Sequence, residues 1–427
     1  MGAGLLSGPE GVYAERGGEL WCEGVPLSRI GDEVGTPCYV YSETAIRRRY
    51  EALAAAFSGV RSRIYYSVKA NHNLAILRLF RALGAGADVV SAGELYRVTR
   101  AGFGGRDVVF GGVGKTPDDL GAGLDAGVRL FNVESVDEID RLDRIAAGRG
   151  VRAPIAVRVN PGVTAETHAY TQTGHYSTKF GVAWEDAEAV YEHARRLTHV
   201  DPVGIDVHIG SQILSPEPYR AALERVRELG ERIRRRGITL RDLDVGGGFG
   251  IAHDDGPGID VAAVAQVVGS VADALEVEAL IEPGRWLVGP AGVLLARILY
   301  VKRLGDQLYY VTDTGSNDFL RPSYYGAFHP IEPVRRAPAE VVADVVGPVC
   351  ESGDFLGRGR SMPALREGDL LAVGFAGAYG FVMSSNYNSR TRAAEVLVSG
   401  DGYRVVRRRE TPADLVAAEE RQGAEAG

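Results

Sequence analysis

The chain has 427 residues and a formal net charge of −8; 45% of its residues are hydrophobic and 24% are charged. This composition is typical of a folded protein with more than one domain and excludes a largely disordered chain. The acidic balance, with no long basic run, argues against a general nucleic-acid-binding protein. Because no apolar run approaches about 18 residues, we expect no membrane span.

The cysteines and the first residues of the chain indicate the cellular compartment in which the protein is expected. Cys22, Cys38 and Cys350 are few, odd in number and widely spaced. Their spacing does not suggest a metal site, and it fits a reducing compartment. The segment MGAGLLSGPEG lacks the basic and apolar regions of a signal peptide. We therefore expect a cytoplasmic protein without a metal centre.

Short β-rich runs alternate with helical patterns between about residues 60 and 282. The strand candidates are residues 63–70, 87–91, 107–112, 128–133, 154–160, 203–209, 240–248 and 277–283. The helix candidates between them include residues 73–84, 92–102, 135–148, 183–197 and 218–237. Such alternation is typical of parallel strands joined by crossover helices. Eight units in succession favour an α/β fold with a (β/α)8 TIM-type barrel over its competitor, a doubly wound sheet.

After residue 290 the pattern changes to strands separated by Gly/Asp turns, beginning with two strands around Gly305 and Asp306. The first 40 residues are also hairpin-like and are followed by the β-rich run YVYS. We therefore expect residues 1–40 to be N-terminal strands that join a C-terminal antiparallel β domain at 291–427. The barrel would occupy residues 41–290.

Polar motifs fall at the carboxyl ends of the predicted barrel strands, where barrel active sites lie. Lys69 closes the first strand, in the run YYSVKANHN. Taken alone, it could be a strand-end lysine that reaches water. An enclosed lysine can also form an imine with an aldehyde cofactor. The convergence of Lys69 with the motifs after the later strands favours the second interpretation.

The later strand ends carry groups that suit a phosphorylated cofactor. Gly246–Gly248 follow the seventh strand and offer bare backbone N–H groups that can cradle a phosphate, to which Ser211 could add a hydroxyl. Glu282 could hold a pyridine nitrogen protonated, or it could pair with Arg285. His208 could stack on such a ring or be a core histidine. No metal-binding spacing accompanies His208.

The predicted β domain has one polar loop with a candidate reactive group. In GPVCESGD, residues 347–354, Cys350 lies next to Glu351 and close to Asp354. A lone cysteine is more often structural than catalytic. Acidic neighbours in a glycine-bounded loop make this cysteine a better candidate for chemistry.

A second group of β-domain residues could bind a substrate. Arg321 and Tyr325 lie four residues apart in one loop. They could be surface groups, but an arginine fork with a phenol hydroxyl also suits a carboxylate. Tyr379 and Tyr387 could pack in the core or line a site, and Tyr379 follows a Gly-Ala pair that permits close approach.

Together these motifs resemble the pyridoxal-phosphate-dependent decarboxylases of the alanine-racemase-like barrel fold, and among them the branch that acts on diaminopimelate. The resemblance covers nearly the whole chain, in the runs GTPCYVYS, YYSVKANHN, GAGADVVSAGEL, KFGV, HIGSQI, DVGGGFGI, EPGR, RPSYYGAFH, GPVCESGD, AGAYGFVMSSNYNSR and RRRETPADLV. CESGD together with SNYNSR is specific to this branch. The lysine, triple-glycine and EPGR motifs are shared with relatives that act on ornithine or arginine.

The resemblance implies a role for each matched residue. The catalytic residues would be Lys69, which binds pyridoxal 5′-phosphate covalently, and Cys350, which returns a proton to the substrate. The cofactor contacts would come from Lys69, His208, Ser211, Gly248, Glu282, Pro283, Gly284, Arg285 and Tyr379. The substrate contacts would come from Arg285, Arg321, Tyr325, Glu351 and Tyr379. Cys350 and Glu351 would act across a subunit boundary, in a homodimer with shared active sites.

The reaction implied is decarboxylation of meso-2,6-diaminopimelate to L-lysine and CO2, the last step of lysine biosynthesis. The alternatives are a paralogous decarboxylase of another, free or carrier-bound, amino acid, a non-catalytic cofactor-binding regulator, and a racemase. Arg321 and Glu351 favour a substrate with a distal amino acid head. The presence of both Lys69 and Cys350 argues against a regulator, and Glu282 argues against a racemase.

The sequence departs from the pattern of these decarboxylases at a few positions. Ser316 and Thr391 stand where Met and Pro are expected, and residues 171–182, TQTGHYSTKFGV, are an unusual version of the loop before KFG. The loop bears on closure of the active site and on fine specificity rather than on the chemistry.

Overall fold

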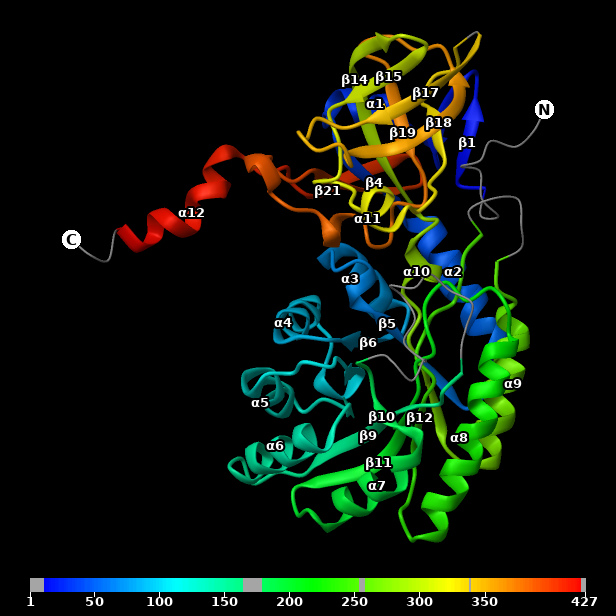
Figure 1. Cartoon of the computed structure of the whole chain (residues 1–427), viewed down its shortest axis with the longest axis vertical. Coiled ribbons are helices and arrows are strands. Elements are labelled where there is room, and N and C mark those ends of the chain that lie inside the picture. Colours follow the sequence, from blue (N-terminus) through cyan, green and yellow to red (C-terminus); the bar gives the residue numbers. More distant parts are fainter. Residues whose placement is uncertain (1–10, 164–178, 253–257, 338, 424–427) are drawn as a thin grey trace. The chain divides into compact units, whose positions relative to one another are not determined.

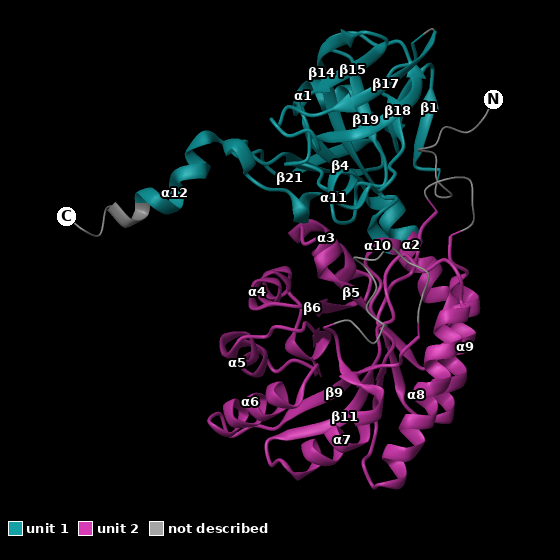
Figure 2. Ribbon diagram, viewed as in Figure 1, with its two compact units in different colours: residues 1–48, 253–255, 287–427 teal, residues 49–252, 256–286 magenta. Residues whose placement is uncertain are grey.

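The computed structural model describes residues 11–163, 179–252, 258–337 and 339–423. The start of the chain, and most of the unusual loop at 171–182, lie outside the described residues. The chain divides into two compact units (Figure 2). The barrel unit comprises the described parts of residues 49–252 and 256–286, and the β unit comprises those of residues 1–48 and 287–427.

The barrel unit is built on a closed ring of eight parallel strands. These are β5 (Ser62–Ser67), β6 (Gly86–Val89), β7 (Val108–Phe110), β8 (Leu130–Val133), β9 (Ala153–Asn160), β11 (Val200–Asp206), β12 (Asp242–Asp244) and β13 (Glu278–Ile281). The ring closes because β9 pairs with β8 as well as with β11, and β13 pairs with β5. The two-residue strand β10 (Val182–Ala183) extends it beside β9. The expected (β/α)8 barrel and all eight strand candidates are confirmed.

Helices follow the strands and lie outside the ring (Figure 1). They are α3 (Leu74–Ala82), α4 (Ala92–Ala101), α5 (Pro117–Ala126), α6 (Val136–Ala147), α7 (Ala187–Arg196), α8 (Glu217–Arg235) and α9 (Val261–Ala274). Two further helices run across the boundary between the units: α2 (Glu43–Ala56), before β5, and the short α10 (Arg285–Val288), after β13. Of the described helices, none is long and apolar enough to cross a membrane.

Side-chain caps set where several of these helices begin. Ser91, Thr116 and Ser135 each accept a hydrogen bond from the backbone N–H three residues later, at the starts of α4, α5 and α6. The side chains of Asn73 and Asp260 cap α3 and α9 in a similar way, since each accepts a hydrogen bond from the backbone N–H two residues later. Because each cap satisfies an otherwise unpaired N–H group, it fixes the end of the loop that leaves the barrel strand. The loop that carries Lys69, between β5 and α3, is one of those that end at such a cap.

The interior of the barrel is filled by side chains from its strands. Tyr65, Val109, Leu130, Ala156, Val203 and Leu280 form one buried cluster. A barrel packed in this way is a core and not a pore. Ligands can therefore bind only at its two ends, and the two ends can carry different chemistry.

The β unit contains most of the remaining strands and helices. Its strands are β1 (Tyr13–Arg16), β2 (Glu19–Cys22), β3 (Val25–Pro26), β4 (Cys38–Ser42), β14 (Gly292–Leu304), β15 (Gln307–Thr312), β16 (Ile331–Pro333), β17 (Glu340–Val346), β18 (Phe355–Pro363), β19 (Leu370–Val373), β20 (Ala394–Ser399) and β21 (Gly402–Arg407). Its helices are α1 (Leu27–Glu33), α11 (Arg321–Tyr325) and α12 (Pro412–Gly423).

The N-terminal strand joins the C-terminal sheet, as expected, because β4 lies between β14 and β20. β1, β2 and β3 form a small sheet of their own. The expected antiparallel arrangement holds for the hairpins, but β4 pairs with β20 and β15 pairs with β17 in parallel. Only strands joined by a tight turn must be antiparallel, and neither of these pairs is joined in that way. The sheet is therefore mixed.

Candidate active site

Lys69 lies in the single 3₁₀ turn Val68–Ala70, directly after β5. Its Nζ is 3.0 Å from Oδ2 of Asp88 on β6. The side chain of Asp88 is 1% exposed, whereas that of Lys69 is 38% exposed. The hydroxyl of Ser67 donates to the same Oδ2 at 2.6 Å. The lysine amine is thus held by a buried carboxylate, and the lysine side chain is partly exposed.

The triple glycine after β12 forms a turn that only glycine allows. Gly246 and Gly248 have φ angles of +65° and +91°, which side chains disfavour. A Cβ atom on Gly247 would collide with the carbonyl of Glu282, and one on Gly248 with that of Gly210. The turn therefore presents bare backbone, as loops that cradle phosphate groups do.

His208 follows β11 and lies against the glycine turn. The backbone N–H of Gly247 donates to its Nδ1 at 3.2 Å. Burial lowers the pKa of His208 well below its ordinary value, and the charges of Arg158 and Lys69 lower it further. The imidazole is therefore neutral, and because Nδ1 accepts a hydrogen bond, its proton is on Nε2.

Glu282 follows β13 and is buried, with 8% of its surface exposed. Its backbone N–H donates to the carbonyl of Gly246 at 2.8 Å. Within the described structure its Oε1 has no hydrogen-bond partner. Burial raises the pKa of Glu282 well above the ordinary value, Asp244 and Asp88 raise it further, and Lys69 opposes them. A buried oxygen without a partner is costly, so this atom is suited to accept from a ligand donor.

The rest of the EPGR motif packs the eighth strand end against the first. The carbonyl of Pro283 accepts a hydrogen bond from the Ser67 backbone at 3.0 Å. A Cβ atom on Gly284 would approach the Cβ atoms of Ala70 and Ser67 to 3.0 Å or less. Arg285 reaches the hydroxyl of Ser211 at 3.4 Å. These contacts place Lys69 and Glu282 on neighbouring strand ends.

In the β unit, Arg321 is nearly buried at the start of α11. Its Nε donates to Nε2 of His329 at 3.3 Å, while Nδ1 of His329 lies 2.9 Å from the carbonyl of Gly374. The histidine therefore carries its proton on Nδ1 and accepts at Nε2. The guanidinium carbon lies 5.3 Å from the ring centre of Tyr325 and 5.9 Å from that of Tyr379. Three predicted substrate residues thus meet in one place.

Cys350 and Glu351 are both exposed and are contacted by the 3₁₀ turn Tyr387–Ser389. The side-chain amide of Asn388 donates to Sγ of Cys350 at 3.4 Å. The hydroxyl of Tyr387 donates to Oε1 of Glu351 at 2.7 Å. This hydrogen bond raises the pKa of Tyr387. The SNYNSR segment therefore positions both groups of the CESGD motif.

Asp354 fixes the loop from within. It is 5% exposed and accepts hydrogen bonds at 2.6 Å from the backbone N–H groups of Val349 and Ser316. A Cβ atom on Gly315 or Gly347 would collide with its carboxylate. The departure at Ser316 is harmless to this contact, because the contact uses only backbone.

The predicted residues therefore form groups within each unit. The barrel end gathers Lys69, His208, Ser211, Gly248, Glu282, Pro283, Gly284 and Arg285, and the β unit carries Arg321, Tyr325, Cys350, Glu351 and Tyr379. Asp88, His329, Asn388 and Glu94 were not assigned roles from the sequence. An aspartate inside the apolar run ADVVS was the one available signal for Asp88.

Comparisons with known proteins extend over nearly the whole chain. The family described as "Pyridoxal-dependent decarboxylase, pyridoxal binding domain" matches residues 43–289. A diaminopimelate decarboxylase from Pseudomonas aeruginosa is 48% identical over 409 residues, which are 96% of this chain and 98% of the relative. The crystal structure of diaminopimelate decarboxylase from Helicobacter pylori complexed with L-lysine has a TM-score of 0.88 and 37% identity, covering 93% of this chain and 100% of that one. The crystal structure of diaminopimelate decarboxylase from M. jannaschii in co-complex with L-lysine has a TM-score of 0.91 and 34% identity, covering 96% of this chain and 97% of that chain.

Glu94, in the first turn of α4, is a partly buried carboxyl group near Lys69 and Asp88. It accepts a hydrogen bond from the backbone N–H of Val90 at 2.9 Å. Burial raises its pKa to about 7, and the charge of Asp88 adds to the effect. The folded protein therefore binds a proton here at pH values where an unfolded glutamate, with a pKa of about 4.3, is ionised.

This shift predicts a pH-dependent stability. Since the native state binds the proton more tightly, the contribution of Glu94 to stability should be fully present at acidic pH and should fall as the pH rises from about 4.3 to 7. Glu94→Gln keeps an acceptor without a titrating proton. The urea midpoint of this variant minus that of the unchanged protein should therefore increase from pH 5 to pH 8. The control Glu228→Gln, at an exposed position of α8, should show no such trend. A constant difference for Glu94→Gln would contradict the shifted pKa.

Proposed function

The chain belongs to the pyridoxal-dependent decarboxylase family, and from this premise we propose that it converts meso-2,6-diaminopimelate to L-lysine and CO2. It is a carboxy-lyase that uses pyridoxal 5′-phosphate and performs the last step of lysine biosynthesis. The observation that carries the chemistry is the orphaned buried oxygen of Glu282 at the barrel end that also holds Lys69.

The residues at this barrel end fit the cofactor. Glu282 Oε1 is a buried acceptor suited to a protonated ring nitrogen. The turn Gly246–Gly248 leaves room for a phosphate because none of its residues has a side chain, although the N–H groups of Gly246 and Gly247 already donate to Asp244 and His208. Beside it, the pair Ser211 and Arg285 supplies side-chain donors. Lys69 has a partly exposed side chain whose amine lies beside the buried carboxylate of Asp88. When bound, pyridoxal phosphate supplies an electron sink for the pair of electrons that departing CO2 leaves behind.

Each barrel residue then has a defined task. Asp88 orients Nζ of Lys69, the covalent attachment point, through the 3.0 Å contact. Glu282 would be held as a carboxylate by the cationic ring nitrogen, since a nearby positive charge opposes the rise of its pKa. His208, neutral and aromatic, would lie against the cofactor ring without adding a competing charge.

The β-unit residues recognise the substrate. Arg321, oriented by His329 and flanked by Tyr325 and Tyr379, binds the distal carboxylate. Glu351, held by the Tyr387 hydroxyl, binds the distal ammonium group. Arg285 and Tyr379 serve both the cofactor and the substrate. A substrate without the distal carboxylate would leave the nearly buried arginine unmatched, which costs binding free energy.

Cys350 completes the reaction. The bond between the α-carbon and its carboxylate breaks, CO2 leaves, and the α-carbon then takes a proton from Sγ of Cys350. The amide of Asn388, which donates to this sulfur at 3.4 Å, stabilises the thiolate that remains. The proton is replaced from solvent, since Cys350 is exposed.

We further propose a homodimer in which Cys350 and Glu351 of the partner subunit complete the site built on Lys69. Large aromatic side chains support an interface on the β unit: Tyr324, Phe328 and Tyr387 are each about half exposed. Such side chains are enriched at subunit contacts. A two-fold interface would build two equal sites.

The proposed compartment is the cytoplasm. Cys22, Cys38 and Cys350 are all free, and only Cys350 is exposed. An exposed thiol that carries a proton must stay reduced, which a reducing compartment ensures.

The role of Arg321 predicts a narrow specificity, which CO2 release can measure. The protein with pyridoxal phosphate should act on meso-diaminopimelate with a kcat/KM at least about 100-fold above that for lysine, ornithine or arginine. Arg321→Ala should lose this preference, mainly through a higher KM for diaminopimelate. Arg404→Ala, which removes an exposed arginine of β21, should leave it unchanged. Comparable rates on lysine or ornithine would refute the proposed substrate.

The shared site predicts complementation between two inactive variants. Lys69→Ala and Cys350→Ala homodimers should each be nearly inactive. After subunit exchange about half of the dimers are mixed, and one of their two sites has both Lys69 and Cys350 intact. Activity should therefore return to roughly a quarter of the unchanged enzyme.

A matched mixture controls for non-specific recovery. Lys69→Ala mixed with the double variant Lys69→Ala/Cys350→Ala has no intact Lys69 and should stay inactive. If the first mixture also stays inactive, although differently tagged subunits co-purify, the site is built within one chain and the proposed sharing is wrong.

A further inference from the structure

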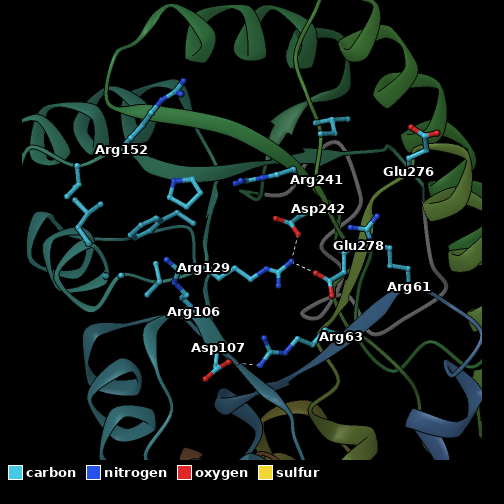
Figure 3. A pocket seen from close by; sticks show the side chains of 18 residues that line it. Arg61, Arg63, Arg106, Asp107, Arg129, Arg152, Arg241, Asp242, Glu276 and Glu278 are labelled. Carbon is cyan, nitrogen blue, oxygen red and sulfur yellow. Dashed lines mark hydrogen bonds and ion pairs between the residues drawn. The ribbon is translucent and has the colours of Figure 1, made fainter.

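A cavity of about 860 Å³ opens at the end of the barrel where the strands begin. The candidate active site lies where the same strands end, so the two places are separate. Six arginines line the cavity against four carboxylates (Figure 3). This is an unusual concentration of positive charge for a chain with a net charge of −8. The volume falls in the range of small-molecule sites, about 300–1,000 Å³.

One part of this cluster stabilises the barrel. Arg129, just before β8, reaches across the ring to Asp242 on β12 and Glu278 on β13 (Figure 3). Arg63 pairs with Asp107 at 2.6 Å. The Arg129 contacts tie together strands on opposite sides of the ring, and residues at this end of a barrel usually serve stability.

The other part of the cluster is not explained by stability. All four carboxylates of the cavity are paired, since Glu276 contacts Arg234 at 3.2 Å and the other three bind Arg63 or Arg129. Among the described residues, Arg61, Arg106 and Arg241 have no ion-pair partner. Three cations gathered around one cavity repel each other, and a bound anion would offset that repulsion.

Two buried polar atoms beneath the cavity also have no hydrogen-bond partner in the described structure: Nε of Arg129 and the hydroxyl of Tyr65. Tyr65 is fully buried. Its ring centre lies 5.3 Å from the Arg63 guanidinium and 6.0 Å from that of Arg129. Unsatisfied buried donors are rare in folded proteins. Here Nε belongs to a guanidinium group that lines the cavity, and the Tyr65 ring lies against two of the guanidinium groups that face it.

The positions of the unpaired arginines limit the kind of ligand. Arg241 directly precedes β12, Arg61 directly precedes β5, and Arg106 lies two residues before β7. In the ring these strands follow the order β12, β13, β5, β6, β7. The three arginines therefore start from different sides of the ring, and β12 and β7 lie opposite each other in it. Guanidinium groups that converge from several sides suit a molecule with several anionic groups, each of which can pair with one arginine.

We propose that this cavity, the N-terminal-end cavity of the barrel, is a binding site for a small multivalent anion, recognised by Arg61, Arg106 and Arg241. Guanidinium groups bind phosphate and carboxylate oxygens through paired N–H donors. The shared chemistry of the ligand is two or more such groups on one small molecule. The site is independent of the proposed decarboxylation, because none of its residues belongs to the catalytic end.

Calorimetric titration of the full-length protein with its cofactor site filled tests this directly. The probes are pyrophosphate and citrate, each at constant ionic strength, after removal of excess pyridoxal phosphate. Arg61→Gln/Arg241→Gln should weaken binding at least about tenfold. Arg100→Gln/Arg141→Gln removes the same two charges from exposed positions on α4 and α6 and should leave the affinity within about twofold.

Each outcome decides the proposal. If only pyrophosphate binds, the ligand carries phosphate groups; if only citrate binds, the ligand is a polycarboxylate. If both bind, the site recognises negative charge in general. Each of these three results supports the proposed cavity site. No binding of either probe, or equal weakening in both double variants, overturns it. If the cavity variant fails to fold, as judged by thermal unfolding, Arg106→Gln alone should weaken binding at least about threefold, and unchanged binding would again overturn the proposal.

Discussion

The contact between Nζ of Lys69 and the buried carboxylate of Asp88 is the interaction on which the candidate site depends. The end of the barrel around it is rich in buried carboxyl groups. Glu282 has a pKa raised by burial, and burial raises that of Asp244 to about 6. Lys69 is the cation that lowers the pKa of Glu282. A cofactor with a protonated ring nitrogen would bring a second positive charge to this acidic pocket. The same electrostatics therefore orient the lysine and select a cationic ring.

The fold supplies this arrangement through its closed ring. Because the interior is packed with apolar side chains, the polar groups of the strands are confined to the two ends. One end carries the lysine, the neutral histidine and the bare glycine turn. The other carries the arginine cavity, where Arg129 connects opposite strands and three further arginines have no ion-pair partner in the described part of the chain. Strand ends on one rigid ring can thus hold two separate polar sites without weakening the core.

Much of the site was predictable because its positions follow from the strand pattern. Lys69, His208, Gly248 and Glu282 each lie within four residues of the end of a strand, and the carboxyl ends of parallel strands meet at one end of a barrel. The roles of Asp88, His329 and Asn388 come from partners 19, 8 and 38 residues away in sequence. No local pattern encodes such contacts.

The limits of the fold prediction have the same origin. Hairpin turns predict antiparallel neighbours, so β14 and β15 were identified from the sequence. The parallel pairs β4–β20 and β15–β17 join segments that share no turn. The arginine cavity could not be predicted from the sequence either. Its arginines are far apart in the chain, and only closure of the ring brings them together.

The central claim is that Lys69 holds the cofactor, and borohydride reduction tests it most directly. The protein loaded with pyridoxal phosphate is reduced, digested and mapped by mass spectrometry. We expect the pyridoxal phosphate adduct on the peptide that contains Lys69, no adduct in Lys69→Ala, and full labelling in the control Lys302→Ala, which changes an exposed lysine of β14. An adduct on another lysine, or one that persists in Lys69→Ala, would contradict the account.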